Sequence, residues 1–152
     1  MTERTKNGNR KLISAEAVVA GDASGEVLLG TSALSFWGGV DAHSGVVLDR
    51  RHNLCGCCLT GRILVLPRAA GSCSTSGILL EMIRLGTMPA AVICLEAEPL
   101  LCMGSVLGEA LYHRSMPVYT VSPEDYQAIR PGCTARIADG GVEIFSDEGG
   151  MA

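Results

Sequence analysis

The chain has 152 residues, a mass of 15.9 kDa, a net charge of −4 and 47% apolar residues. This length suits one domain with a substantial core, and the apolar content excludes a disordered chain. The acidic balance and the 4% of aromatic residues argue against a nucleic-acid binder. No apolar run reaches the roughly 18 residues that span a bilayer, and the polar start lacks a secretory-signal pattern. We therefore expect a cytoplasmic protein that contacts neither nucleic acid nor membrane.

The first third of the chain is expected to be a tail, two strands and a long loop. Residues 1–11 are polar and predict a flexible tail. Residues 13–20 and 26–31 are short apolar runs around a glycine-containing turn, as in paired strands. Residues 35–61, rich in Gly, His, Asp and Cys, predict loops with one short strand at 46–48.

The rest of the chain alternates strand-like and helix-like patterns. Strands are predicted over 62–66, 90–95, 117–121, 133–138 and 142–145, and helices over 76–85 and from Pro99 to about Tyr112. Gly86 is a typical residue just past a helix end, and Ser122, Pro123 and Asp125 fit the start of another helix. This order predicts an α/β fold with parallel strands, crossover helices and a second, partly antiparallel layer. We expect a single domain over residues 12–146 and a tail over 147–152.

The loop Gly71–Gly77 joins a predicted buried strand to a helix N-terminus. Free backbone N–H groups and the helix dipole at such a place favour an anion, including a deprotonated hydroxyl. A serine of this loop is therefore a candidate base or nucleophile. The alternative, of equal weight, is that Ser74 or Thr75 only caps the helix. The loop fits neither a P-loop nor the nucleophile elbow of serine hydrolases.

Acidic residues and histidines have structural interpretations beside functional ones. Glu96 and Glu98 follow the second parallel strand, where they either line the same cleft as the serine loop or complement the dipole of the next helix. Asp41 and Asp49 are expected to form turns. The three histidines, at 43, 52 and 113, are expected to lie at the surface or to cap backbone groups.

The cysteines give one candidate metal site. Cys55, Cys57 and Cys58 lie close to His52 and resemble half of a zinc or iron–sulfur site. The other cysteines are scattered, so we favour unliganded thiols in a reducing compartment. Cys94 and Cys102 lie in apolar runs and are expected to be core residues.

Several segments together resemble the small subunit, or swivel domain, of the aconitase X family. The resemblance covers about residues 13–122, and no single motif in it is diagnostic. It rests on the order and spacing of four segments: Phe36–Asp41, Ser44–Asp49 with His52, Gly61–Pro67 followed by Gly71-Ser72, and Ala90–Ile93 with Glu96–Pro99.

The resemblance implies a swivelling β/β/α domain like the fourth domain of aconitase. It implies a large-subunit partner that carries iron or an iron–sulfur cluster, with no metal bound by this chain, and a small hydroxy acid as substrate. Ser72 would be the base that removes the proton α to the carboxylate, with Ser74 as the other candidate. Gly71, Cys73, Ser74 and Arg68 would contact the substrate. Bacterial members dehydrate cis-3-hydroxy-L-proline to Δ1-pyrroline-2-carboxylate, the substrate we favour, and archaeal members dehydrate phosphomevalonate.

The chain also departs from the family pattern. Ala69-Ala70 stands where glycine and a basic residue are expected, Cys57-Cys58 where an acid or serine is expected, and Asn53 where proline is common. A different class of function is a non-catalytic metal- or ligand-binding module built on Cys55, Cys57 and Cys58. A phosphohistidine carrier ranks last, because the serine loop contains no histidine.

Overall fold

The described part of the chain, residues 9–70, 74–138 and 141–146 of a computed structural model, contains the predicted alternation of strands and helices from Ile63 to Val121. It adds three short elements that were not predicted, Leu34–Ser35, Phe36–Gly39 and Ala69–Ala70. Its strands are β1 (Asn9–Val19), β2 (Ala23–Leu29), β3 (Leu34–Ser35), β4 (Ile63–Leu66), β5 (Ala69–Ala70), β6 (Ala91–Cys94), β7 (Val118–Val121), β8 (Thr134–Ala138) and β9 (Gly141–Ser146). Its helices are α1 (Phe36–Gly39), α2 (Ser74–Leu85), α3 (Pro99–Tyr112) and α4 (Pro123–Ala128).

Of the two expected terminal tails, only residues 9–11 belong to the described part of the chain. Residues 1–8 and 147–152 lie outside the described residues. Residues 9–11, which we expected in the tail, instead form the start of β1 and pair with the end of β9. An ion pair between Arg10 and Glu143 joins the same two strands.

Seven strands close into a barrel in the order β1-β7-β6-β4-β2-β8-β9. One half is parallel, because β2, β4, β6 and β7 run in the same direction, and the other half is antiparallel. Two long strands connect the halves: β1 pairs first with β9 and then with β7, and β2 pairs first with β8 and then with β4. The parallel strands with crossover helices are confirmed, and the expected second layer is the antiparallel half of the barrel.

The predicted pairing of the first two strands with each other is wrong. Both strands exist, but the partners of β1 are β7 and β9, and those of β2 are β4 and β8. The glycines between and within them serve close approaches of the backbone instead of a hairpin turn. A Cβ atom at Gly25 would lie 2.6 Å from the carbonyl oxygen of Gly61, and one at Gly21 would lie 2.7 Å from the ring of Pro117.

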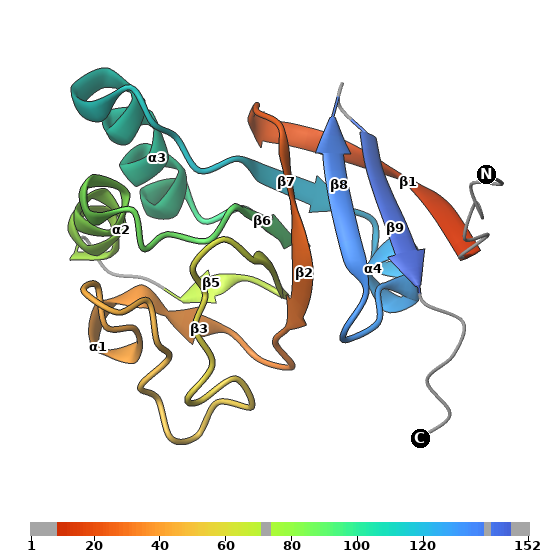
Figure 1. Cartoon of the computed structure of the whole chain (residues 1–152), viewed down its shortest axis with the longest axis horizontal. Helices are drawn as coiled ribbons and strands as arrows, with labels where there is room; N and C mark the ends of the chain where they lie inside the picture. Colours follow the sequence, from red (N-terminus) through yellow and green to blue (C-terminus); the bar gives the residue numbers. More distant parts are fainter. Residues whose placement is uncertain (1–8, 71–73, 139–140, 147–152) are drawn as a thin grey trace, which may run out of the picture.

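Side chains of the parallel strands alternate between two cores, as the period of a strand requires. Ile63 and Val65 of β4 point into the barrel, whereas Leu64 and Leu66 pack against the helices. The same alternation continues along β6 and β7. Figure 1 shows the result, with α1, α2 and α3 gathered on one side of the barrel and α4 at one of its ends.

The crossover helices pack closely through two glycines. A Cβ atom at Gly108 of α3 would lie 2.7 Å from Ile83 Cδ1 of α2, and one at Gly104 would lie 3.2 Å from the side chain of Leu79. The opposite face of α3 leaves apolar side chains exposed, among them Met103 and Val106. Within the described residues, no helix is both long enough and apolar enough to cross a membrane.

Residues 35–61 contain less strand and more helix than expected. The predicted strand at 46–48 is reduced to isolated bridges, which join Val47 to Val40 and Val46 to Cys58. The one-turn helix α1 was not predicted, and its Trp37 and Gly38 depart from helical backbone angles.

Candidate functional site

The connections that leave the parallel strands meet at one edge of the barrel. The backbone N–H of Gly30, after β2, donates to the carbonyl of Val65 over 2.8 Å. The N–H groups of Leu95 and Glu96, after β6, donate to the carbonyl of Pro67, after β4, over 3.1 and 3.3 Å. This edge is the carboxyl end of the parallel strands, where open α/β sheets bind their ligands.

The segment before the serine loop is held at this edge by a second small sheet. Strand β3 pairs in parallel with β5, so that Leu34 lies opposite Ala69 and Ser35 opposite Ala70. Three of the predicted site residues, Gly71, Ser72 and Cys73, follow directly and lie outside the described residues. The other two are described and exposed: Arg68 precedes β5, and Ser74 is the first residue of α2.

Two hydroxyl groups in the first turn of α2, beside that of the exposed Ser74, differ in their hydrogen bonding. Ser76 Oγ donates to the carbonyl oxygen of Leu100, in the first turn of α3, over 2.6 Å. Thr75 is fully buried, and its Oγ1 has no hydrogen-bond partner among the described residues. A buried hydroxyl without a partner carries a cost in free energy, so this one is a notable feature next to the predicted serine loop.

Glu98 has the second of the two roles considered for this acidic pair, at the start of the next helix. One oxygen of its carboxylate accepts from the backbone N–H groups of Leu100 and Leu101 over 2.6 and 3.0 Å, and so caps α3. Pro99 is the first helical residue, as predicted. The side chain of Glu96 is exposed.

A hollow lies at the same end of the parallel strands, beyond β6 and β7. It is polar, has a volume of about 340 Å³ and is lined by Ser14, Ala15, Glu16, Leu95, Thr120, Val121 and Ser122. Its residues from β1 could not be assigned to this edge from the sequence, because the pairing of β1 with β7 was not predicted. Ser122 also caps α4, as expected, by accepting from the N–H of Asp125 over 3.2 Å.

His52 and Asn53 together bind the connection that follows β2. His52 is 5% exposed, and its two ring nitrogens lie 3.0 Å from the carbonyl oxygen of Ser32 and 3.1 Å from the N–H of Leu54. Asn53 Oδ1 accepts from Thr31, and its Nδ2 donates to the carbonyl of Leu29 over 2.9 Å. His52 was expected to lie at the surface or to cap backbone groups; it caps them from a buried position.

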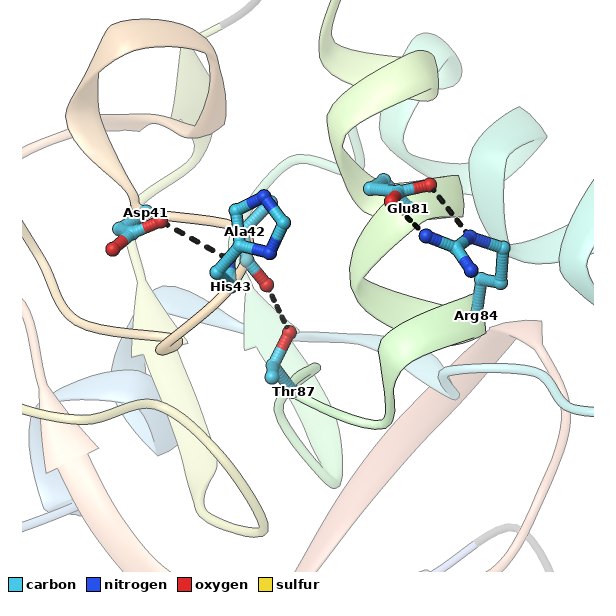
Figure 2. Close-up of polar contacts among 6 residues, drawn as sticks. All are labelled: Asp41, Ala42, His43, Glu81, Arg84 and Thr87. Carbon is cyan, nitrogen blue, oxygen red and sulfur yellow. Dashed lines mark hydrogen bonds and ion pairs between the residues drawn. The ribbon is translucent and has the colours of Figure 1, made fainter.

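The aspartates of the long loop form turns, as predicted. Asp41 accepts from the backbone N–H of His43 over 3.0 Å and from the hydroxyl of Ser44 over 2.9 Å. These bonds, with the serine hydroxyl first, hold the pKa of Asp41 below its ordinary value. Figure 2 shows this turn beside α2, where Arg84 forms an ion pair with Glu81 that lowers the pKa of the glutamate.

The cysteines do not assemble a metal site in the described part of the chain. Among those residues, no group of three or more His, Cys, Asp or Glu side chains is placed to hold a metal ion. Cys55 is exposed, and Cys58 Sγ lies 3.4 Å from the carbonyl oxygen of Ser44. The hydroxyl and the backbone N–H of Thr60 lower the pKa of Cys58.

The two cysteines expected in the core differ in burial. Cys94 is buried, and its burial raises the pKa of its thiol to about 12. Cys102 is half-buried, and burial again raises its pKa.

Comparison with known proteins gives a family match over most of the chain. The sequence model of the aconitase X swivel domain matches residues 12–144. A structure of the holo-form of aconitase X from Thermococcus kodakaraensis superposes with a TM-score of 0.79 and 30% identity, covering 90% of this chain and 99% of that one.

Two curated relatives carry different activities in their names. A cis-3-hydroxy-L-proline dehydratase from Pseudomonas aeruginosa is 43% identical over 136 residues, which are 90% of this chain but 23% of the relative's length. A phosphomevalonate dehydratase small subunit from Methanopyrus kandleri is 52% identical over 90 residues, which are 59% of this chain and 67% of that one. The chain thus spans less than a quarter of the first relative and two thirds of the second.

Proposed function

The chain belongs to the aconitase X swivel domain family, and we propose that it is the small subunit of a dehydratase acting on a hydroxy acid. The observation that supports this most directly is the placement of α2 and β5. They flank the serine loop at the carboxyl end of the parallel strands, where the connections after β2, β4 and β6 meet. A helix N-terminus at such an edge stabilises negative charge.

In this proposal Ser72 removes the proton α to the carboxylate of the substrate. A serine alkoxide is costly in water, and aimed N–H groups of a helix N-terminus lower that cost. Ser74, exposed in the first turn of α2, is the second candidate for the base. Arg68, exposed immediately before β5, supplies a positive charge for the carboxylate, and Gly71 and Cys73 provide contacts beside Ser72.

In this proposal the metal of the reaction lies in a large subunit. The described residues of this chain offer no cluster that fits a metal ion. An iron or iron–sulfur centre on the partner would supply the Lewis acid for the departing hydroxyl. For the same reason the Cys55–Cys58 segment gives little support to a metal-binding module.

We favour cis-3-hydroxy-L-proline as the substrate, with Δ1-pyrroline-2-carboxylate as the product. The match to the hydroxyproline dehydratase extends over 136 residues, against 90 for the phosphomevalonate dehydratase small subunit. The higher identity of the shorter match, 52% against 43%, keeps phosphomevalonate as the second candidate.

The test is anaerobic reconstitution with the cognate large subunit and side-by-side assay of both acids. We expect turnover of hydroxyproline only when both chains are present. Ser72→Ala should lower kcat by about 10²–10⁴-fold, the usual contribution of a general base, without weakening assembly. Ser74→Ala is the matched variant: a loss in Ser74→Ala but not in Ser72→Ala would move the base to Ser74. Absence of binding to any large subunit would reject the proposed function.

A further inference from the structure

We propose that His52 and Asn53 are positioning residues, which hold the serine-bearing edge in place through the connection between β2 and β3. This inference rests on the proposed function, in which the serine loop supplies the base. Both would act through β3 and β5, the described strands that lead to the serine loop.

Asn53 binds both ends of a short stretch of backbone. Its Oδ1 accepts from the N–H of Thr31 over 2.9 Å and from the hydroxyl of Thr31 over 3.1 Å. Its Nδ2 donates to the carbonyl of Leu29 over 2.9 Å. The side-chain amide thus satisfies a donor and an acceptor of the chain where it leaves β2.

His52 binds the residue that follows this stretch, Ser32. We call the contacts of His52 and Asn53 with residues 29–32 the clamp. The N–H of Leu54 donates to His52 Nδ1 over 3.1 Å, so the ring proton lies on Nε2 and is donated to the carbonyl of Ser32 over 3.0 Å. The ring also fills the space beside Gly30, where a Cβ atom would lie 3.1 Å from His52 Cε1. The neutral imidazole therefore joins its own loop to the connection after β2.

The clamped connection leads directly to the predicted base. Two residues after Ser32 the chain enters β3, whose Ser35 lies opposite Ala70 of β5. Ala70 is the residue before Gly71-Ser72. A shift of the connection therefore moves β3, and with it the strand that carries the serine loop.

Because Asn53 is exposed, replacing it should test positioning without disturbing the core of the fold. Its side chain is exposed, and its hydrogen bonds to described residues go to Leu29 and Thr31, within one segment. Thr60 offers a matched control. It is also exposed and donates one long-range hydrogen bond, to the carbonyl of Thr87 over 2.9 Å, but it lies at the amino end of β4.

The experiment compares Asn53→Ala, Asn53→Asp and Thr60→Ala in the full chain by hydrogen exchange. We expect Asn53→Ala to raise the exchange rate of the β3 and β5 amides by about tenfold or more. The hydrogen bonds of Asn53 no longer oppose local opening of these strands. Asn53→Asp keeps both acceptor contacts to Thr31 and should give a smaller rise. Thr60→Ala should leave these amides unchanged. Equal rates in Asn53→Ala and Thr60→Ala would overturn the proposal.

The second readout is turnover by the complex with the large subunit. A base displaced by about 1 Å costs up to about 100-fold in rate, so Asn53→Ala should lower kcat by about tenfold or more with little change in KM. Partial recovery in Asn53→Asp would mark the contacts to Thr31 as the cause. Faster exchange with an unchanged kcat would also overturn the proposal. An inactive wild-type complex would reject the proposed function instead, and the exchange rates would still decide whether the clamp exists.

Discussion

Ser76 Oγ donates a hydrogen bond to the backbone carbonyl of Leu100 over 2.6 Å, and this bond joins the first turns of α2 and α3. The two helices begin at the same edge of the barrel, since each follows a parallel strand. Glu98 caps the first turn of α3 two residues away. The bond therefore ties the helix start next to the serine loop to an already capped helix.

Replacing Ser76 by alanine should destabilise the chain by about 1 kcal/mol, because the carbonyl of Leu100, a half-buried residue, loses the hydroxyl as a donor. In a chain of this size, that change lowers Tm by about 2–4 °C. The measurement is thermal unfolding, with Ser74→Ala as the control, because Ser74 is exposed and has no partner among the described residues. A Tm equal in the two variants would show that the bond adds nothing to stability.

Thr75→Val should stabilise the isolated chain by about 1 kcal/mol. The substitution replaces a buried hydroxyl that has no partner in the described structure by a methyl group of similar size. Thr75→Ser is the matched variant, since it keeps the hydroxyl and removes the methyl group, and it should destabilise the chain. Denaturant unfolding measures both. A loss of stability in Thr75→Val would mean that the hydroxyl has a partner in solution.

The parallel half of the fold was predictable because its signals are local. Strands such as Ile63–Leu66 are continuous apolar runs, and Gly86 and Pro99 mark a helix end and a helix start that the structure confirms. The pairing of β1 and β2 was not predictable. An apolar pattern tells which face of a strand is buried but not which strand lies beside it. Both strands also divide their length between two neighbours.

At the candidate site, too, the roles with a local sequence signal were predictable and those that depend on distant residues were not. The capping role of Glu98 follows from its place just before Pro99, so the sequence contained the signal. The contacts of His52 and Asn53 with the connection after β2 could not be predicted, because they join residues at least 20 positions apart and most of the partners are backbone groups, which have no signature in the sequence. The buried hydroxyl of Thr75 also became evident only from the packing around it.

Gly108→Ala should destabilise the chain by about 1–3 kcal/mol despite the higher helix propensity of alanine. The added Cβ atom would lie 2.7 Å from Ile83 Cδ1 and 2.8 Å from the carbonyl oxygen of Arg114. Gly77→Ala in α2 is the control, because no atom lies within 4 Å of its added Cβ. It should stabilise the chain by up to about 1 kcal/mol. The prediction fails if both substitutions change the free energy of unfolding in the same direction.

The rates at which Cys58 and Cys94 are alkylated should depend differently on pH. The Thr60 hydroxyl and backbone N–H lower the pKa of Cys58, whereas burial raises that of Cys94 to about 12. Because the thiolate is the reactive form, modification of Cys58 should reach half its maximal rate below the ordinary thiol pKa, while Cys94 stays unmodified at pH 8. Thr60→Ala should move the Cys58 midpoint to higher pH, since the hydroxyl that stabilises the thiolate is gone. Mass spectrometry of peptides after timed alkylation measures both rates, and an unmoved midpoint in Thr60→Ala would assign the shift to other groups.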